Sequence, residues 1–122
     1  MHHNEHTLKL QLPDEAATQR LGTLLATHLV PGMRLYLRGE LGAGKTTLVR
    51  ALLRALGHTG RVKSPSYALV EPYTISRLYL YRFDFYRFRD PNEWTDSGFR
   101  ELFASRAVCV VEWPEKADGL LP

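Results

Sequence analysis

The sequence has few of the features that mark secreted or membrane proteins. Its single cysteine, Cys109, excludes an intramolecular disulfide, and the apolar residues around it predict a buried strand thiol. No stretch approaches the ~20 consecutive apolar residues of a membrane-spanning helix. The polar N-terminus also lacks the apolar core of a signal peptide. We therefore expect a cytoplasmic protein without membrane contact.

Lysine is scarce, because twelve of the sixteen basic residues are arginine. The net charge of +3 is compatible with anionic partners but does not require them. Arginine suits phosphate because its planar guanidinium donates two parallel hydrogen bonds, yet scattered surface arginines also serve only to solvate a protein. Composition alone leaves contact with nucleic acid open.

The size and composition predict one globular domain over residues 1–122. Hydrophobic residues make up 44% and charged residues 24%, a balance too apolar for a disordered chain. The His-rich start, residues 1–6, is expected to be mobile rather than a metal site.

Periodicity and turn residues predict alternating strands and helices. Alternation over 8–12 indicates a strand, and an amphipathic helix follows from Asp14 until Pro31 and Gly32. Next come a short strand at 35–37, a helix at 45–56, strands at 67–73 and 78–83 that pair as a hairpin, a helix from Asp90 through Phe103, and a strand at 107–111. The last strand is continuously apolar, which is typical of a strand buried on both faces.

A glycine-rich loop lies between the strand at 35–37 and the helix at 45–56. It matches G-x-x-x-x-G-K-[ST] with Gly39, Glu40, Leu41, Gly42, Ala43, Gly44, Lys45 and Thr46. Glycines let backbone N–H groups converge on phosphates at a helix N-terminus. The lysine bridges the terminal phosphates, the Thr46 hydroxyl suits Mg²⁺, and Thr47 can donate to an inner phosphate.

A chance match to this pattern occurs roughly once in a few hundred chains of this length. The loop therefore predicts a nucleoside triphosphate with magnesium, although it does not distinguish ATP from GTP. A carboxylate beside triphosphate is repelled, so the Glu40 side chain is expected to point to solvent. The expected fold is α/β and P-loop NTPase-like: a three-layer sandwich with helices on both faces of a mostly parallel sheet and an antiparallel hairpin.

Two acids stand at the ends of apolar strands, where P-loop enzymes need a carboxylate for the metal and the attacking water. Glu112 follows the run 107–111, and Asp84 follows the strand at 78–83. Each could instead be a solvated acid beyond a strand end. Burial on both faces favours Glu112 as the magnesium ligand.

Residues 77–89 interleave six aromatics with four arginines. Such a mixture suits stacking on RNA bases and pairing with phosphates. The alternative, which we favour, is a half-buried strand whose aromatics pack in the core and whose arginines solvate its edge. Trp113 presents a similar choice, because it could border the nucleotide or only close the core.

Together these motifs resemble the TsaE (YjeE) family, bacterial ATPases that act in making threonylcarbamoyladenosine in tRNA. The elements that carry the resemblance are the loop 39–47, the run Ser64, Pro65, Ser66 and Tyr67, the segment 83–87 and the segment 110–114. Their order covers about residues 35–116. The family often has Thr where this chain has Ser66, and Phe where it has Tyr67.

The resemblance implies ATP as the nucleotide, Thr46 and Glu112 as magnesium ligands, Asp84 as an aid to hydrolysis, and Ser64–Tyr67 as a switch near the terminal phosphate. It also implies the partners TsaD and TsaB, with tRNA contacted indirectly. Relatives continue past residue 114 with further strand and basic residues, so we expect this chain to be truncated at its C-terminus.

Three functions remain at this stage. The first is an ATPase of the tRNA-modification machinery, slow alone because the sequence shows no obvious arginine finger and a partner would complete the site. The second is a small-molecule P-loop kinase, for which no clear lid segment is evident. The third is a non-enzymatic module whose affinity for a partner is switched by nucleotide.

Overall fold

The computed structural model describes residues 14–38, 43–62, 70–75, 78–90, 92–96, 98–117 and 120–121. Its elements are α1 (Glu15–Ala26), β1 (Arg34–Leu37), α2 (Ala43–Ala55), β2 (Val70–Ile75), β3 (Leu78–Asp84), α3 (Asn92–Asp96), α4 (Phe99–Ala104), β4 (Val108–Glu112) and the 3-10 helix η1 (Pro114–Ala117). The predicted strand at 8–12, the mobile start at 1–6 and the segment Ser64–Tyr67 lie outside the described residues.

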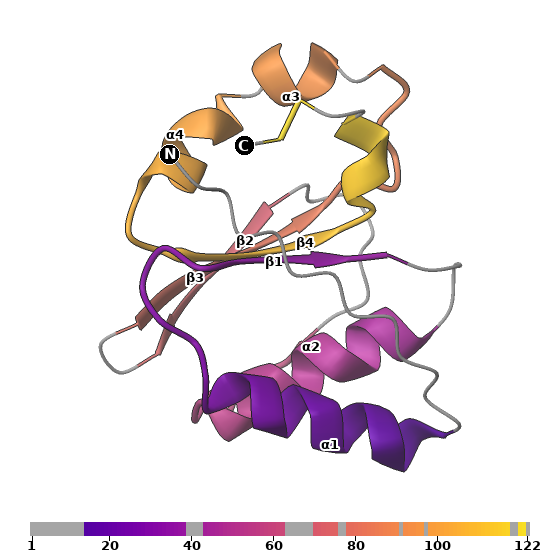
Figure 1. Cartoon of the computed structure of the whole chain (residues 1–122), viewed down its shortest axis with the longest axis vertical. Coiled ribbons are helices and arrows are strands. Elements are labelled where there is room, and N and C mark those ends of the chain that lie inside the picture. The colour runs from indigo at the N-terminus through magenta and orange to yellow at the C-terminus, as the bar shows by residue number, and fades with distance from the viewer. Residues whose placement is uncertain are drawn as a thin grey trace.

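The four described strands form one sheet in the order β1-β4-β3-β2. β4 pairs in parallel with β1 on one side and β3 on the other, and β2 pairs antiparallel with β3. In Figure 1, α1 and α2 cover one face of this sheet, whereas α3, α4 and η1 lie over the other. The predicted α/β sandwich, with a mostly parallel sheet and an antiparallel hairpin, is confirmed.

β4 is the most buried strand of the sheet. All five of its residues are buried, as its continuous apolar sequence predicts for a strand covered on both faces. Because side chains alternate along a strand, Val108 and Val110 belong to one core and Cys109 and Val111 to the other.

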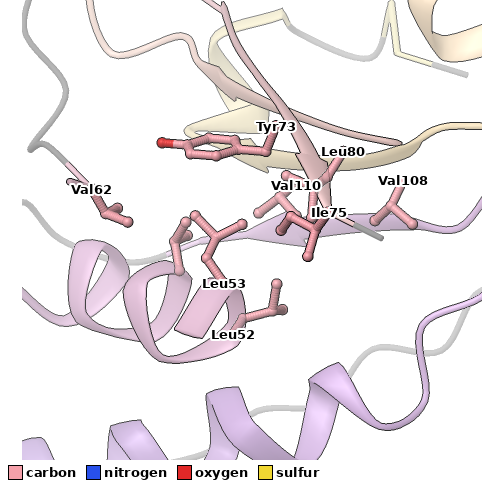
Figure 2. Close-up of a cluster of buried hydrophobic side chains, with 9 residues drawn as sticks. Leu52, Leu53, Val62, Tyr73, Ile75, Leu80, Val108 and Val110 are labelled. Atoms are coloured by element: carbon pink, nitrogen blue, oxygen red, sulfur yellow. The ribbon is translucent and has the colours of Figure 1, made fainter. Parts of the chain in front are cut away.

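The first core lies between the sheet and α2. Leu52 and Leu53 of α2 pack with Val110 of β4 and Leu80 of β3, and Figure 2 shows their side chains converging in the space between helix and sheet. Packing of this kind, rather than helix propensity, supplies most of the stability of a 13-residue helix.

The second core lies under α3, α4 and η1 and contains most of the aromatic stretch. Phe83, Phe85 and Phe88 are buried there, with Trp94 and Phe103 from the two short helices. Tyr79 and Tyr86 are exposed. Packing in the core is therefore confirmed for the three phenylalanines, but the expectation that the arginines solvate the edge is wrong for Arg82, which is 1% exposed.

The helix predicted from Asp90 through Phe103 is not continuous in the structure. Its start is as expected, because the Glu93 carboxylate accepts hydrogen bonds from the backbone N–H groups of Arg89 and Asp90. The helix then divides into α3 and α4 at Gly98, whose φ of 78° lies in the left-handed region. A right-handed helix cannot continue through that conformation.

The predicted helix start at Asp14 is confirmed, and Asp14 caps α1 by accepting a 2.8 Å hydrogen bond from the backbone N–H of Ala17. None of the helices among the described residues is both long and apolar enough to cross a membrane.

Gly22 allows α1 to lie close against α2. A β-carbon on Gly22 would stand 2.7 Å from the carbonyl oxygen of Leu48 and 3.1 Å from the backbone nitrogen of Leu52. We predict that Gly22→Ala lowers the free energy of unfolding by about 1–2 kcal/mol, because the clash with backbone atoms outweighs the better helix propensity of alanine. Chemical denaturation would measure this, with the exposed Gln19→Ala as a control that changes little. An equally stable Gly22→Ala would contradict this close approach.

Burial should make Cys109 unreactive in the folded chain. Desolvation raises the pKa of the thiol to about 11, and the side chain is fully buried. Because the thiolate is the nucleophile, we predict that an aromatic disulfide reagent near pH 8 labels the native chain at least about a hundredfold more slowly than the chain in denaturant. Similar rates in both states would show that the strand opens readily.

Candidate functional site

The start of α2 presents three of the predicted phosphate-binding residues. Lys45 is half-buried, and Thr46 and Thr47 are buried in the first turns of the helix. β1 ends at Leu37 and α2 begins at Ala43, so the chain joins the carboxyl end of a parallel strand to a helix N-terminus, as the motif requires. Gly39, Glu40, Leu41 and Gly42 lie outside the described residues.

Gly44 is not required by the packing of the protein around it. Among the described residues, no atom lies within 4 Å of the position that a β-carbon on Gly44 would take, and its φ is not in the left-handed region. The packing of the protein therefore gives no reason for a glycine at this position, and the described residues leave open space beside its backbone.

The two candidate carboxylates stand side by side. Asp84 ends β3, Glu112 ends β4, and the two residues pair directly in the parallel register. Glu112 also pairs with Leu37 of β1, so these acids lie at the sheet edge from which the chain runs toward α2. Alternation from Val110 directs the Glu112 side chain toward the α2 face of the sheet.

Both carboxylates are buried, at 9% exposure for Asp84 and 2% for Glu112. Desolvation raises the pKa of each one. For Asp84 the rise is opposed chiefly by the hydrogen bond that its carboxylate accepts from the backbone N–H of Tyr86, at 3.0 Å. For Glu112 it is opposed chiefly by the charge of Arg82.

Arg82 forms a buried ion pair with Glu112 that the sequence analysis did not anticipate. Its Nε donates to Oε2 of Glu112 at 2.8 Å, and its Nη1 lies 3.4 Å from Oε1 of Glu71 on β2. Burial alone would lower the pKa of Arg82, but the carboxylate of Glu112 raises it, so the guanidinium stays charged. One feature of the sequence could have indicated that Arg82 belongs to the site. Arg82 and Asp84 are two residues apart, so both side chains lie on the same face of β3.

Lys45 lies among these groups. Its Nζ is 3.5 Å from the centroid of the Trp113 ring, within the range of a cation–π interaction. Burial lowers the pKa of Lys45, and the charges of Glu115, Glu112 and Asp84 oppose this effect. The charges of both strand-end acids therefore act on the lysine, together with that of Glu115, an exposed residue that was not predicted as part of the site.

Trp113 does more than close the core, because it also borders Lys45. It is half-buried, its ring centroid lies 5.1 Å from that of Tyr86, and its φ of 59° is in the left-handed region. That conformation is uncommon for a bulky residue. It occurs at the step from β4 into η1, directly after Glu112.

Thr46 and Glu112 offer oxygen donors of the kind that magnesium takes. Among the described residues, no group of three or more His, Cys, Asp or Glu side chains could hold a metal ion. Magnesium is commonly held by one or two protein oxygens together with phosphates and water, a role that suits a threonine hydroxyl and a carboxylate such as those of Thr46 and Glu112.

Comparison with known proteins identifies the family. The family model described as "Threonylcarbamoyl adenosine biosynthesis protein TsaE" matches residues 12–122. A relative from Haemophilus influenzae, named tRNA threonylcarbamoyladenosine biosynthesis protein TsaE, is 45% identical over 95% of this chain and 77% of its own length. The protein of the same name from Bacillus subtilis is 37% identical over 94% of this chain and 72% of its own length.

A solved structure extends the likeness to the fold. The crystal structure of YdiB from Bacillus subtilis superposes with a TM-score of 0.73 at 33% sequence identity, covering 89% of this chain and 66% of that one. The family model spans most of the chain, and both relatives exceed 30% identity over most of their length. By these matches and by the fold, the chain belongs to the TsaE family.

Proposed function

We propose that this chain binds ATP with magnesium and hydrolyses it in support of threonylcarbamoyladenosine formation in tRNA. One observation carries the proposal: Lys45, at the start of α2, lies within electrostatic reach of two strand-end carboxylates that are neighbours in the sheet, Asp84 and Glu112. A phosphate-binding lysine beside a pair of acids is what phosphoryl-transfer chemistry with magnesium requires.

The helix start supplies the phosphate contacts. Backbone N–H groups of residues 39–47 and the positive end of the α2 dipole would hold the phosphates, and Lys45 would neutralise the charge that develops on the terminal one. Thr47 would donate to an inner phosphate. Thr46 and Thr47 are both buried, which supports roles for their hydroxyls within the site rather than in contact with bulk water.

The strand ends supply the groups for the metal and for water. Glu112 and Thr46 would hold magnesium, which when bound neutralises phosphate charge. Asp84 would orient the attacking water; the hydrogen bond from the Tyr86 N–H fixes its carboxylate for this task. Trp113, in contact with Lys45, would border the nucleotide. We assign the switch near the terminal phosphate to Ser64–Tyr67 on the family resemblance.

The partners follow from the family. We propose that the chain acts in the cytoplasm as one domain with TsaD and TsaB, that tRNA is contacted through those partners, and that hydrolysis by the chain alone is weak.

Release of phosphate from ATP, measured with and without TsaD, TsaB and tRNA, tests the dependence on partners. Stimulation by the partners supports the proposal, and transfer of label from ATP to a hydroxyl acceptor would establish a kinase instead. Binding without any hydrolysis, even with partners, would indicate a nucleotide-switched module.

Lys45→Ala should abolish most nucleotide binding and turnover. Removing the cation that faces the terminal phosphate should cost about a hundredfold or more in ATPase activity. Lys116→Ala is a suitable control, because Lys116 is an exposed lysine of η1 and its loss should change the rate little. Calorimetric titration with Mg-ATP and a phosphate-release assay would measure both effects. Full affinity and activity in Lys45→Ala would refute the phosphate-loop assignment.

Glu112→Gln should weaken magnesium dependence more than Asp84→Asn does. The amides keep the shape of the buried side chains, so they remove charge without leaving a cavity. We expect the magnesium concentration for half-maximal ATPase to rise roughly tenfold or more for Glu112→Gln, whereas Asp84→Asn should chiefly lower the maximal rate. Titration of magnesium at saturating ATP separates the two effects, and the opposite order would exchange the two roles.

A further inference from the structure

We propose that Arg82 is a positioning residue that orients the carboxylate of Glu112 for magnesium. This inference rests on the proposed function, because it assigns Arg82 a task only if Glu112 serves the metal. Arg82 itself would touch neither nucleotide nor metal.

The geometry of the pair supports an orienting role. Nε of Arg82 donates to Oε2 of Glu112 at 2.8 Å, a short charge-assisted hydrogen bond. The side chains are only 1% and 3% exposed, so water competes little for either one. A carboxylate that is hydrogen-bonded at one oxygen in a buried site cannot rotate freely. Its other oxygen therefore keeps a fixed direction. Residues that hold metal ligands in this way commonly change metal affinity when they are replaced.

Arg82 is itself held from the opposite side. Glu71 of β2 pairs with Arg82 in the antiparallel register, and its Oε1 lies 3.4 Å from Nη1 of Arg82. Glu71 is also 3.4 Å from the hydroxyl of Tyr73. Three charged side chains from β2, β3 and β4 thus form a row across the α2 face of the sheet, which ends at Glu112.

The charge of Arg82 also serves the site. Asp84 and Glu112 are neighbours in the sheet, and two carboxylates so close repel each other. The guanidinium of Arg82, placed between Glu71 and Glu112, offsets part of that repulsion. Glu112 can therefore stay beside Asp84 and Lys45 in a buried position.

A purely structural ion pair is the competing explanation, and magnesium dependence distinguishes the two. Arg82→Lys keeps the charge but replaces the planar guanidinium with a point donor. We expect it to fold and to raise the magnesium concentration for half-maximal ATPase about tenfold. Binding of Mn²⁺ with a non-hydrolysable ATP analogue, followed by calorimetry, should weaken by a similar factor without relying on turnover. A structural role would lower the unfolding midpoint and leave both metal measurements unchanged.

Glu71→Gln is the matched control. It weakens the other ion pair of Arg82 but leaves the contact with Glu112, so the magnesium requirement should change by less than about twofold. A double-mutant cycle adds the decisive comparison: in a Glu112→Gln background, Arg82→Lys should produce no further change in magnesium dependence, because the ligand it orients is gone.

Two results would overturn the inference in distinguishable ways. If Glu112→Gln weakens metal binding but Arg82→Lys does not, Arg82 has no positioning role and the proposed function stands. If Glu112→Gln leaves metal binding unchanged, the metal assignment of Glu112 itself fails, and the role of Arg82 fails with it.

A measurement on the unsubstituted chain covers the case in which the Arg82 variant does not fold. The Arg82 Nε–H resonance should be protected from exchange by its buried hydrogen bond, and it should shift when magnesium and the ATP analogue are added together. The same resonance should not shift in Glu112→Gln. An Arg82 signal that is insensitive to magnesium in the unsubstituted chain would overturn the proposal.

Discussion

The parallel pairing of β4 between β1 and β3 is the constraint on which the site depends. Parallel strands bring their carboxyl ends to one edge of the sheet, so Leu37, Asp84 and Glu112 end side by side although they are far apart in the chain. The same edge is where the chain leaves β1 toward the N-terminus of α2. Burial of every residue of β4 stabilises this arrangement, because a shift of register by one residue would turn Val108 and Val110 away from α2.

The site concentrates charge in a region that is otherwise apolar. Arg82, Asp84 and Glu112 are all buried, and isolated buried charges are unfavourable. Their arrangement explains how they are accommodated: Arg82 pairs with Glu112, Asp84 accepts a backbone hydrogen bond, and Lys45 lies near both acids. A network of this kind is weak evidence for stability, since apolar residues of similar volume often stabilise a fold equally well. Its position at the strand ends agrees with the role in phosphate and metal binding proposed above.

The two faces of the sheet have separate tasks. The face toward α2 carries the charged row and the first core, whereas the face toward α3 and α4 holds tilted aromatic rings such as Phe83, Phe85 and Phe103. The aromatic face contributes to the site indirectly, because it anchors the turn after β3 and the step from β4 into η1. Trp113 lies at that step, between β4 and η1, and its ring contacts Nζ of Lys45.

Local chemistry in the sequence was enough to predict several of these features. The helix start at Asp14, the reach of Glu93 back to Asp90 and the buried strand around Cys109 depend on neighbours within a few residues or on continuous apolarity. The division of the helix at Gly98 was missed, because a single glycine within a helical pattern is often tolerated and its left-handed conformation follows from the packing of two short segments.

By itself, the sequence predicted phosphate binding by the glycine loop, and it determined the acids at the strand ends and the alternation of strands and helices, because each depends on residue type and spacing along the chain. Only the tertiary structure decided that Arg82 is buried against Glu112, thirty residues away, and that Lys45 rests on Trp113. Such contacts depend on strand order and register, which place distant residues together through the packing of the whole sheet.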